Sequence, residues 1–222
     1  MGEAREIDMA LLFADLSGYT ALTETHGGLR ASEIVLRFVS IVEASLEPGV
    51  TIVSSIGDDV FVIGAETLAV ARTAFRLRDA VEREPRFPRI RMGIHRGPII
   101  EREGRLFGAP INLTARLCDH AEGGHILCTQ PIAEAISALA EIEPRSLGEM
   151  HFKNVSRSVE VFELRRMTEK RASAEVDPVC RMQVAAGRAA AAVEHAGVTY
   201  LFCSVECARD FANAPELYVN TR

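Results

Sequence analysis

The sequence lacks both an excess of basic residues and any long apolar run. Its 222 residues carry 25 Lys and Arg against 31 Asp and Glu, a net charge of −6, so a nucleic-acid partner is not expected. No apolar run reaches the length of a transmembrane helix. The apolar run 9–14 near the N-terminus is short and is closed by Asp15, which argues against a signal peptide. We therefore expect a cytoplasmic protein with no membrane span.

Cysteines are scarce over most of the chain. Only Cys118 and Cys128 precede residue 180, and both lie in apolar patterns that predict core packing. Cys180, Cys203 and Cys207 fall within the last 43 residues. Because disulfides are not expected in a reducing cytoplasm, this cluster favours a metal-binding or redox role.

The remaining composition, 48% hydrophobic and 25% charged, is that of a globular protein with one sizeable core and room for a small extra domain. Strand and helix patterns alternate over residues 1–166 and predict an α+β sandwich with one layer of sheet. The polar and small residues of segment 167–174 predict a linker. We expect residues 175–222, which follow it, to form a small second unit. The expected strands are 11–14, 51–56, 60–63, 89–95, 98–102, 125–128, 147–152 and 159–164, and the expected helices are 20–46, broken near Gly27-Gly28, 65–84, 107–120 and 131–139.

Two acids follow predicted strands. Asp15 ends the first strand and precedes Ser-Gly-Tyr-Thr at 17–20 and a helix, an arrangement that suits a metal-bound phosphate: the carboxylate binds the cation, and free backbone N–H groups meet the anion. Asp58 lies in the turn of a predicted hairpin. Either acid alone also fits an ordinary turn role. Together they fit a site for two cations about 3.5–4 Å apart.

A third candidate element lies on the helix near residue 112. Asn112 and Arg116 are spaced i, i+4 and share one helix face. Such a pair is often surface decoration. Arg is also the residue best suited to stabilise charge on a transferring phosphoryl group.

Together these segments resemble the catalytic domain of class III nucleotidyl cyclases, over about residues 7–165. The five stretches that carry the resemblance occur in the family's order and are FADLSGYT, SSIGDDVFVIG, GIHRGP, FGAPINLTARL and LGEMHFKNVSRSVEVFEL. The resemblance implies a ferredoxin-like α+β core. It also implies a homodimer with shared active sites, each taking Asp15 and Asp58 from one chain and Asn112 and Arg116 from the other.

The same resemblance implies the chemistry. Asp15 and Asp58 would bind two Mg²⁺ or Mn²⁺ ions per site, and Asp59 has no assigned role. A nucleoside triphosphate would be converted to a 3′,5′-cyclic nucleotide and pyrophosphate. Asn112 and Arg116 would stabilise the transition state. Lys153 and the loop after the first strand would contact the triphosphate; the loop residues are Leu16, Ser17, Gly18, Tyr19 and Thr20.

Two positions depart from the family's pattern. Adenine-specific members usually carry a Lys where this chain has Ser54, and an Asp where it has Arg105. Without that hydrogen-bond readout, base selection rests on shape and stacking. Three interpretations remain: an adenylate cyclase with unusual base recognition, a promiscuous or weak cyclase, and a non-catalytic nucleotide-binding sensor.

The last segment, from about residue 177 to 218, resembles the YHS domain, a small metal-associated module. The stretches DPVCRMQV and YLFCSVECARDF carry this resemblance. Cys203 and Cys207 are spaced i, i+4, so a helix that begins near Ser204 can direct both thiols one way. Three thiolates suit Cu⁺ or, with a fourth ligand, Zn²⁺. His195 is a candidate for that ligand, although a His before Ala-Gly also fits a turn, and a small apolar core with buried thiols is the alternative.

Overall fold

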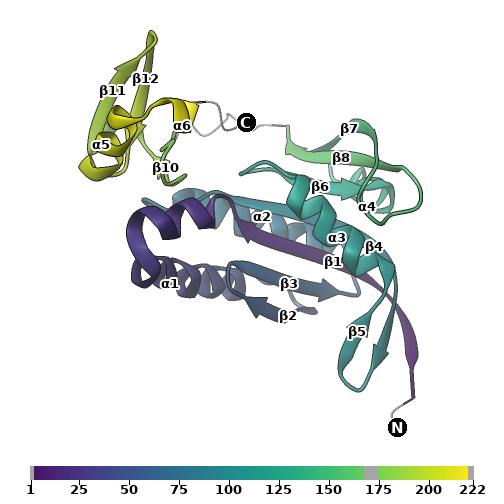
Figure 1. The fold of residues 1–222 in the computed structure, drawn as a ribbon. Coiled ribbons are helices and arrows are strands. Elements are labelled where there is room, and N and C mark those ends of the chain that lie inside the picture. The colour runs from purple at the N-terminus through teal and green to yellow at the C-terminus, as the bar shows by residue number, and fades with distance from the viewer. Residues whose placement is uncertain (1–2, 168–174, 220–222) are drawn as a thin grey trace.

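The computed structural model describes residues 3–167 and 175–219 of the chain (Figure 1). The predicted linker 167–174 therefore lies, apart from Met167, outside the described residues. None of the described helices combines the length and the apolar character that crossing a bilayer requires.

A βαββαβ unit forms the core. Its central strands follow the order β2-β3-β1-β4, and every neighbouring pair is antiparallel. This is the ferredoxin-like arrangement, and it confirms the predicted fold class. The elements are β1 (Arg5–Leu16), α1 (Tyr19–Ser45), β2 (Val50–Ile56), β3 (Asp59–Gly64), α2 (Thr67–Arg83) and β4 (Ile90–Arg102).

Further strands widen this sheet beyond β4. β6 (Ile126–Thr129) pairs parallel with β4, and β8 (Val159–Arg166) and β7 (Ile142–Met150) follow in antiparallel order. α4 (Gln130–Ile136) follows β6, and α3 (Ala109–His120) precedes it.

The two faces of the sheet carry different helices because side chains alternate along each strand. Even-numbered residues of β1, such as Leu12, pack in the main core with Phe38 of α1 and Leu77 of α2. The odd-numbered Leu11 packs with Ile111 of α3 in a separate cluster. Asp15 is odd-numbered, so it belongs to the face that α3 covers (Figure 1).

The strand pattern differs from the sequence prediction at Pro98. Two strands were expected around it, but β4 runs unbroken and pairs with β1 through Pro98. On its other edge β4 meets β6 only at residues 92–94 and β5 (Arg105–Phe107) only at residues 100–102. Proline is tolerated because its missing N–H falls where no strand is paired. The short strand β5 was not predicted.

The C-terminal unit consists of two small hairpins and two helices. Its strands are β9 (Glu175–Val176), β10 (Gln183–Val184), β11 (Ala191–His195) and β12 (Val198–Phe202). A 3₁₀ turn, η1 (Ala186–Arg188), precedes β11, and α5 (Val205–Asn213) and α6 (Glu216–Val219) close the chain. Phe202 and Phe211 fill its core together with the three cysteines.

This unit packs against the first domain near the end of β1 and the start of α1 (Figure 1). Gln183 is buried there, and its side-chain amide donates to the carbonyl of Phe87 at 3.3 Å. Met182 forms an isolated bridge with Pro88. Arg181 lies against Gly18, so closely that a Cβ atom added at Gly18 would clash with the Cγ atom of Arg181. The two units therefore share a contact at the loop that follows Asp15.

Candidate active site and metal centre

Asp15 lies near the end of β1 with a charged neighbour on each flanking strand. It stands opposite Asp59 of β3 and opposite Arg91 of β4, so all three side chains share the face covered by α3. The Arg91 Nε and Nη2 atoms both lie 2.5 Å from Asp15 Oδ2. Asp15 is only 5% exposed, so Arg91 supplies much of its charge compensation.

Asp58 completes a carboxylate pair with Asp15. The hairpin between β2 and β3 turns at Gly57-Asp58, and Gly57 has φ 61°, which a glycine adopts without strain. Burial, together with a hydrogen bond to Asp58, raises the pKa of Asp15 to about 7, against the opposing effect of Arg91. A divalent cation bound here would favour the ionised form of Asp15, and oxygen donors suit Mg²⁺ or Mn²⁺. The residues present therefore fit the cations that the sequence implies.

The loop after β1 leads into α1 with its first amides available. Gly18 is the N-cap in a left-handed conformation, and no side chain in the described part of the chain caps the helix. The Ser17 N–H donates to the carbonyl of Arg89 at 2.8 Å, so it is already used. The N–H groups of the first helical turn, which begins at Tyr19 and Thr20, are therefore the donors that this loop could offer to an anion.

The other predicted site residues make no direct contact with the carboxylate pair in the described part of the chain. Asn112 and Arg116 are both exposed on α3, and Arg116 pairs with Asp119 at 2.9 Å. Lys153 is exposed in the turn after β7. Ser54 is partly buried on β2, and Arg105 is exposed on β5.

One chain does not bring these groups together. Among the contacts of the described residues, none joins Asn112 or Arg116 to Asp15 or Asp58. The pairing register places Ser54 level with Gly93 of β4, whereas Arg105 is level with Arg102. At about 3.3 Å per residue these two levels are roughly 30 Å apart along the strand.

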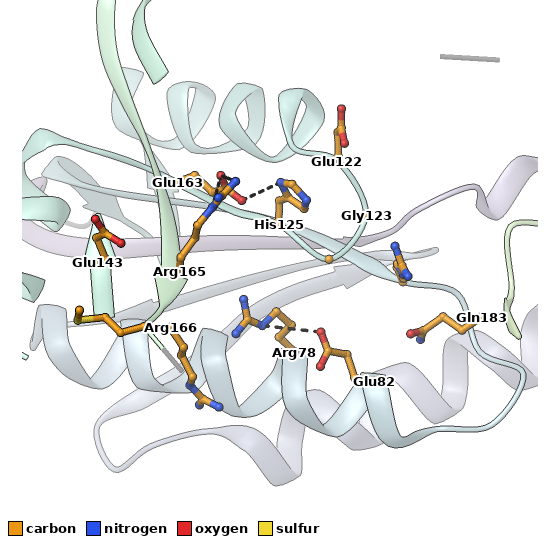
Figure 2. Close-up of a pocket in the computed structure, with 13 residues that line it drawn as sticks. Arg78, Glu82, Glu122, Gly123, His125, Glu143, Glu163, Arg165, Arg166 and Gln183 are labelled. Atoms are coloured by element: carbon orange, nitrogen blue, oxygen red, sulfur yellow. Dashed lines mark hydrogen bonds and ion pairs between the residues drawn. The ribbon is translucent and has the colours of Figure 1, made fainter. Parts of the chain in front are cut away.

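A cavity of about 660 Å³ lies away from the carboxylate pair, between α2, β8 and the C-terminal unit (Figure 2). Its charged side chains pair with one another: Glu163 contacts His125 Nδ1 at 3.0 Å and Arg165 Nη2 at 2.5 Å. None of the residues predicted for catalysis lines it. We assign it no role.

The three C-terminal cysteines converge as the sequence predicted. The Sγ atoms of Cys180 and Cys203 lie 3.3 Å apart, and those of Cys203 and Cys207 lie 3.8 Å apart. All three residues are buried, and all are free thiols. Hydrogen bonds from Cys180 and then Cys203 lower the pKa of Cys207, so this sulfur is the most readily ionised of the three.

The fourth member of the cluster is His26 of α1, which sequence reasoning missed. Its Nε2 atom lies 3.7 Å from Cys203 Sγ and 3.8 Å from Cys207 Sγ. The four candidate ligand atoms all fall within 4.8 Å of one another. His195, the candidate from the sequence, is not in this cluster. It is the last residue of β11, beside a turn, and packs edge-on against Phe211.

Buried Asp177 organises the backbone around the thiols. Its Oδ1 atom accepts from the N–H of Val179 at 2.9 Å, and its Oδ2 atom accepts from the N–H of Cys203 at 2.8 Å. Ser204 caps α5 by accepting from the N–H of Cys207 at 3.1 Å. These bonds fix the two turns that carry the cysteines.

Comparison with known proteins agrees with both parts of this description. The sequence model of the YHS domain family matches residues 176–222. A pH-sensitive adenylate cyclase of Mycobacterium tuberculosis is 27% identical over 166 residues, which is 73% of this chain and 41% of that protein. The chain thus spans less than half the length of this curated relative.

Solved structures show the same relationship. An adenylyl cyclase of P. aeruginosa superposes with a TM-score of 0.65 at 21% identity, covering 77% of this chain and 100% of that one. An adenylate/guanylate cyclase/hydrolase of Silicibacter pomeroyi has a TM-score of 0.60 at 26% identity, covering 72% of this chain and 97% of that one. The chain therefore joins a domain with the class III nucleotidyl cyclase catalytic fold to a C-terminal YHS domain.

Proposed function

We propose that the protein is a nucleotidyl cyclase that converts a nucleoside triphosphate, with ATP favoured, into a 3′,5′-cyclic nucleotide and pyrophosphate. The observation that carries this proposal is the carboxylate pair of Asp15 and Asp58, set beside the uncapped start of α1 within a cyclase catalytic fold. ATP is favoured because several curated relatives are named adenylate cyclases. A cytoplasmic location stays a prediction from the sequence.

Asp15 and Asp58 would hold two Mg²⁺ or Mn²⁺ ions. Bound there, the cations supply charge neutralisation of the phosphates and a lower pKa for the attacking 3′-hydroxyl. The N–H groups at the start of α1, including those of Tyr19 and Thr20, would donate to phosphate oxygens and orient the chain of phosphates for in-line attack. Arg91 would favour the ionised form of Asp15 and hold the carboxylate in position, because its guanidinium already binds one carboxylate oxygen.

We further propose a head-to-tail homodimer that completes each site with groups from the second chain. Asn112 and Arg116 are exposed and make no contact with the acids of their own chain. Supplied by a partner, Arg116 would exchange Asp119 for the charge that develops on the α-phosphate, and Asn112 would position the ribose. Lys153 would bind the terminal phosphates as they leave.

Ser54 and Arg105 occupy the two positions that we predict for base recognition. Neither side chain carries the charge typical of adenine-specific relatives. We therefore expect weak discrimination between ATP and GTP.

The test is cyclic-nucleotide formation by the purified full-length chain with Mn²⁺ and either ATP or GTP. The wild-type chain should form product, and Asp58→Ala should lower kcat by at least about a hundredfold through loss of cation binding. Asp59→Asn is the matched control, because it removes the charge of an acid opposite Asp15 that is not a predicted cation ligand. Absence of product from every nucleoside triphosphate, with micromolar binding retained, would instead favour the non-catalytic sensor.

A further inference from the structure

The cluster of thiols described above spans two domains. Cys180, Cys203 and Cys207 belong to the YHS domain, and His26 belongs to α1 of the cyclase domain, 177 residues before Cys203. We propose that these four residues form one Cys₃His site for Zn²⁺, in which the cyclase domain supplies the histidine. The site would then fasten the YHS domain to the helix that follows the Asp15 loop.

The spacing of the donor atoms matches tetrahedral zinc. With Zn–S bonds of about 2.3 Å and Zn–N bonds of about 2.0–2.1 Å, tetrahedral geometry requires S···S separations of about 3.8 Å and S···N separations of about 3.5 Å. The Cys203–Cys207 sulfurs are 3.8 Å apart, and the Nε2 atom of His26 is 3.7 and 3.8 Å from these sulfurs. The Cys180–Cys203 separation, 3.3 Å, must open slightly, and all other pairs lie within 4.8 Å, so any adjustment is small.

The donor set favours zinc over copper. Four donors around one point close a tetrahedral shell, as structural zinc sites do, whereas Cu⁺ is satisfied by two or three thiolates and needs no imidazole. The shell also lies in a buried setting that Asp177 and Ser204 already shape through backbone hydrogen bonds. Little reorganisation is needed to bind the ion.

The position of His26 links this site to the proposed active site. His26 is the last residue before Gly27, where α1 breaks, so it ends the short helical segment that starts at Tyr19. The other end of that segment follows Gly18, on which Arg181 of the YHS domain packs. The YHS domain therefore contacts both ends of the segment whose first N–H groups are the proposed phosphate donors. Zinc loss should loosen that segment.

The test is metal binding by the reduced, chelator-treated full-length chain, titrated with Zn²⁺ and Co²⁺. The wild-type chain should bind one ion, and Co²⁺ should give the intense visible bands of a tetrahedral site with thiolate charge transfer. His26→Ala should retain the thiolate bands but bind Zn²⁺ at least tenfold more weakly. His195→Gln, which alters a histidine of the YHS domain outside the cluster, should bind as the wild type does.

A variant that replaces the histidine ligand with a cysteine ligand tests whether misfolding explains the weaker binding. His26→Cys should keep tight Zn²⁺ binding and increase the charge-transfer intensity of Co²⁺ by about a third, as four thiolates replace three. Equal Zn²⁺ affinity in the wild type and His26→Ala would overturn the proposal, and so would a wild-type chain that binds no zinc.

The link between the zinc site and the loop after β1 affects catalysis only if the proposed function is right. The link itself is therefore tested by a measurement that needs no turnover. Hydrogen exchange of residues 19–26 should speed up when zinc is removed from the wild type and should already be fast in His26→Ala. Unchanged exchange on zinc removal would contradict the link. An inactive chain that still binds zinc through His26 would refute the cyclase proposal and leave this one standing.

Discussion

Burial favours the uncharged form of several ionisable side chains of the central sheet, among them Asp15 and His95. It raises the pKa of Asp15, and the structure places Arg91 and Asp58 beside that carboxylate to decide its charge. It lowers the pKa of His95 on β4 to about 4. The hydrogen-bond partner of His95 is a hydroxyl, Thr129 Oγ1 at 2.7 Å, and the charge of Asp8 opposes the shift without cancelling it.

The lowered pKa of His95 predicts that the stability of the protein depends on pH. Its pKa is about 4 in the folded chain and 6.5 when unperturbed, so the unfolded chain takes up this proton first as pH falls. The stability contributed by neutral His95 is complete above pH 6.5 and is lost progressively toward pH 4. His95→Gln keeps a hydrogen-bonding side chain without the titration. Its unfolding free energy, measured by denaturant between those pH values, should fall less steeply than that of the wild type; equal slopes would contradict this assignment.

Among the helices and strands, α1 is interrupted by a residue with a non-helical backbone, and this break places His26 at the end of a short helical segment. Gly27 has φ 78° and ψ 162° inside the helix, a conformation that is essentially restricted to glycine. The break ends the segment that carries His26 and lets the rest of the helix pack Phe38 and Ile41 into the core.

Two neighbouring glycines offer a matched test of that break. Nothing lies within 4 Å of a Cβ added at Gly27 or at Gly28, so only the backbone distinguishes them. Gly27→Ala should lower the free energy of unfolding by about 1–3 kcal/mol and weaken zinc binding. Gly28→Ala, in the helical conformation, should raise stability by about 0.5–1 kcal/mol. Thermal denaturation with a zinc titration measures both, and similar destabilisation by the two substitutions would argue against a strained break.

Much of the element order follows from local patterns. The apolar runs, the Gly-Asp hairpin turn and the Gly-Gly break in α1 each depend on a few adjacent residues, and all three appear in the structure. Pro98 misled the prediction of β4, because whether a proline interrupts a strand depends on which edge is paired. That information lies in the neighbouring strands and not in the sequence around Pro98.

At the scale of the whole molecule, some site residues can be predicted from nearby sequence and others cannot. Cys180, Cys203 and Cys207 could be found from spacing within one small unit, and their convergence is confirmed. His26 could not, since nothing near it in sequence distinguishes it from a surface histidine on a helix. Only the docking of the YHS domain on α1 brings it to the thiols.

The predicted catalytic residues do not all contact one another within one chain. Asp15 and Asp58 pair at one end of the sheet, while Asn112 and Arg116 are exposed on α3 and engaged with neither acid. A second chain would supply the groups that each site lacks. Each composite site would combine the acids of one chain with the Asn and Arg of the other.

The most direct measurement of this claim is turnover in a mixture of two inactive chains, Asp58→Asn and Arg116→Ala. Asp58 and Arg116 are suitable because neither is buried, so each chain should fold. Each chain alone should be almost inactive. After co-assembly at equal amounts, half of the dimers should be mixed with one intact site each, giving about a quarter of wild-type cyclic-nucleotide formation. A mixture that stays as inactive as its components, although mixed dimers form, would contradict the account.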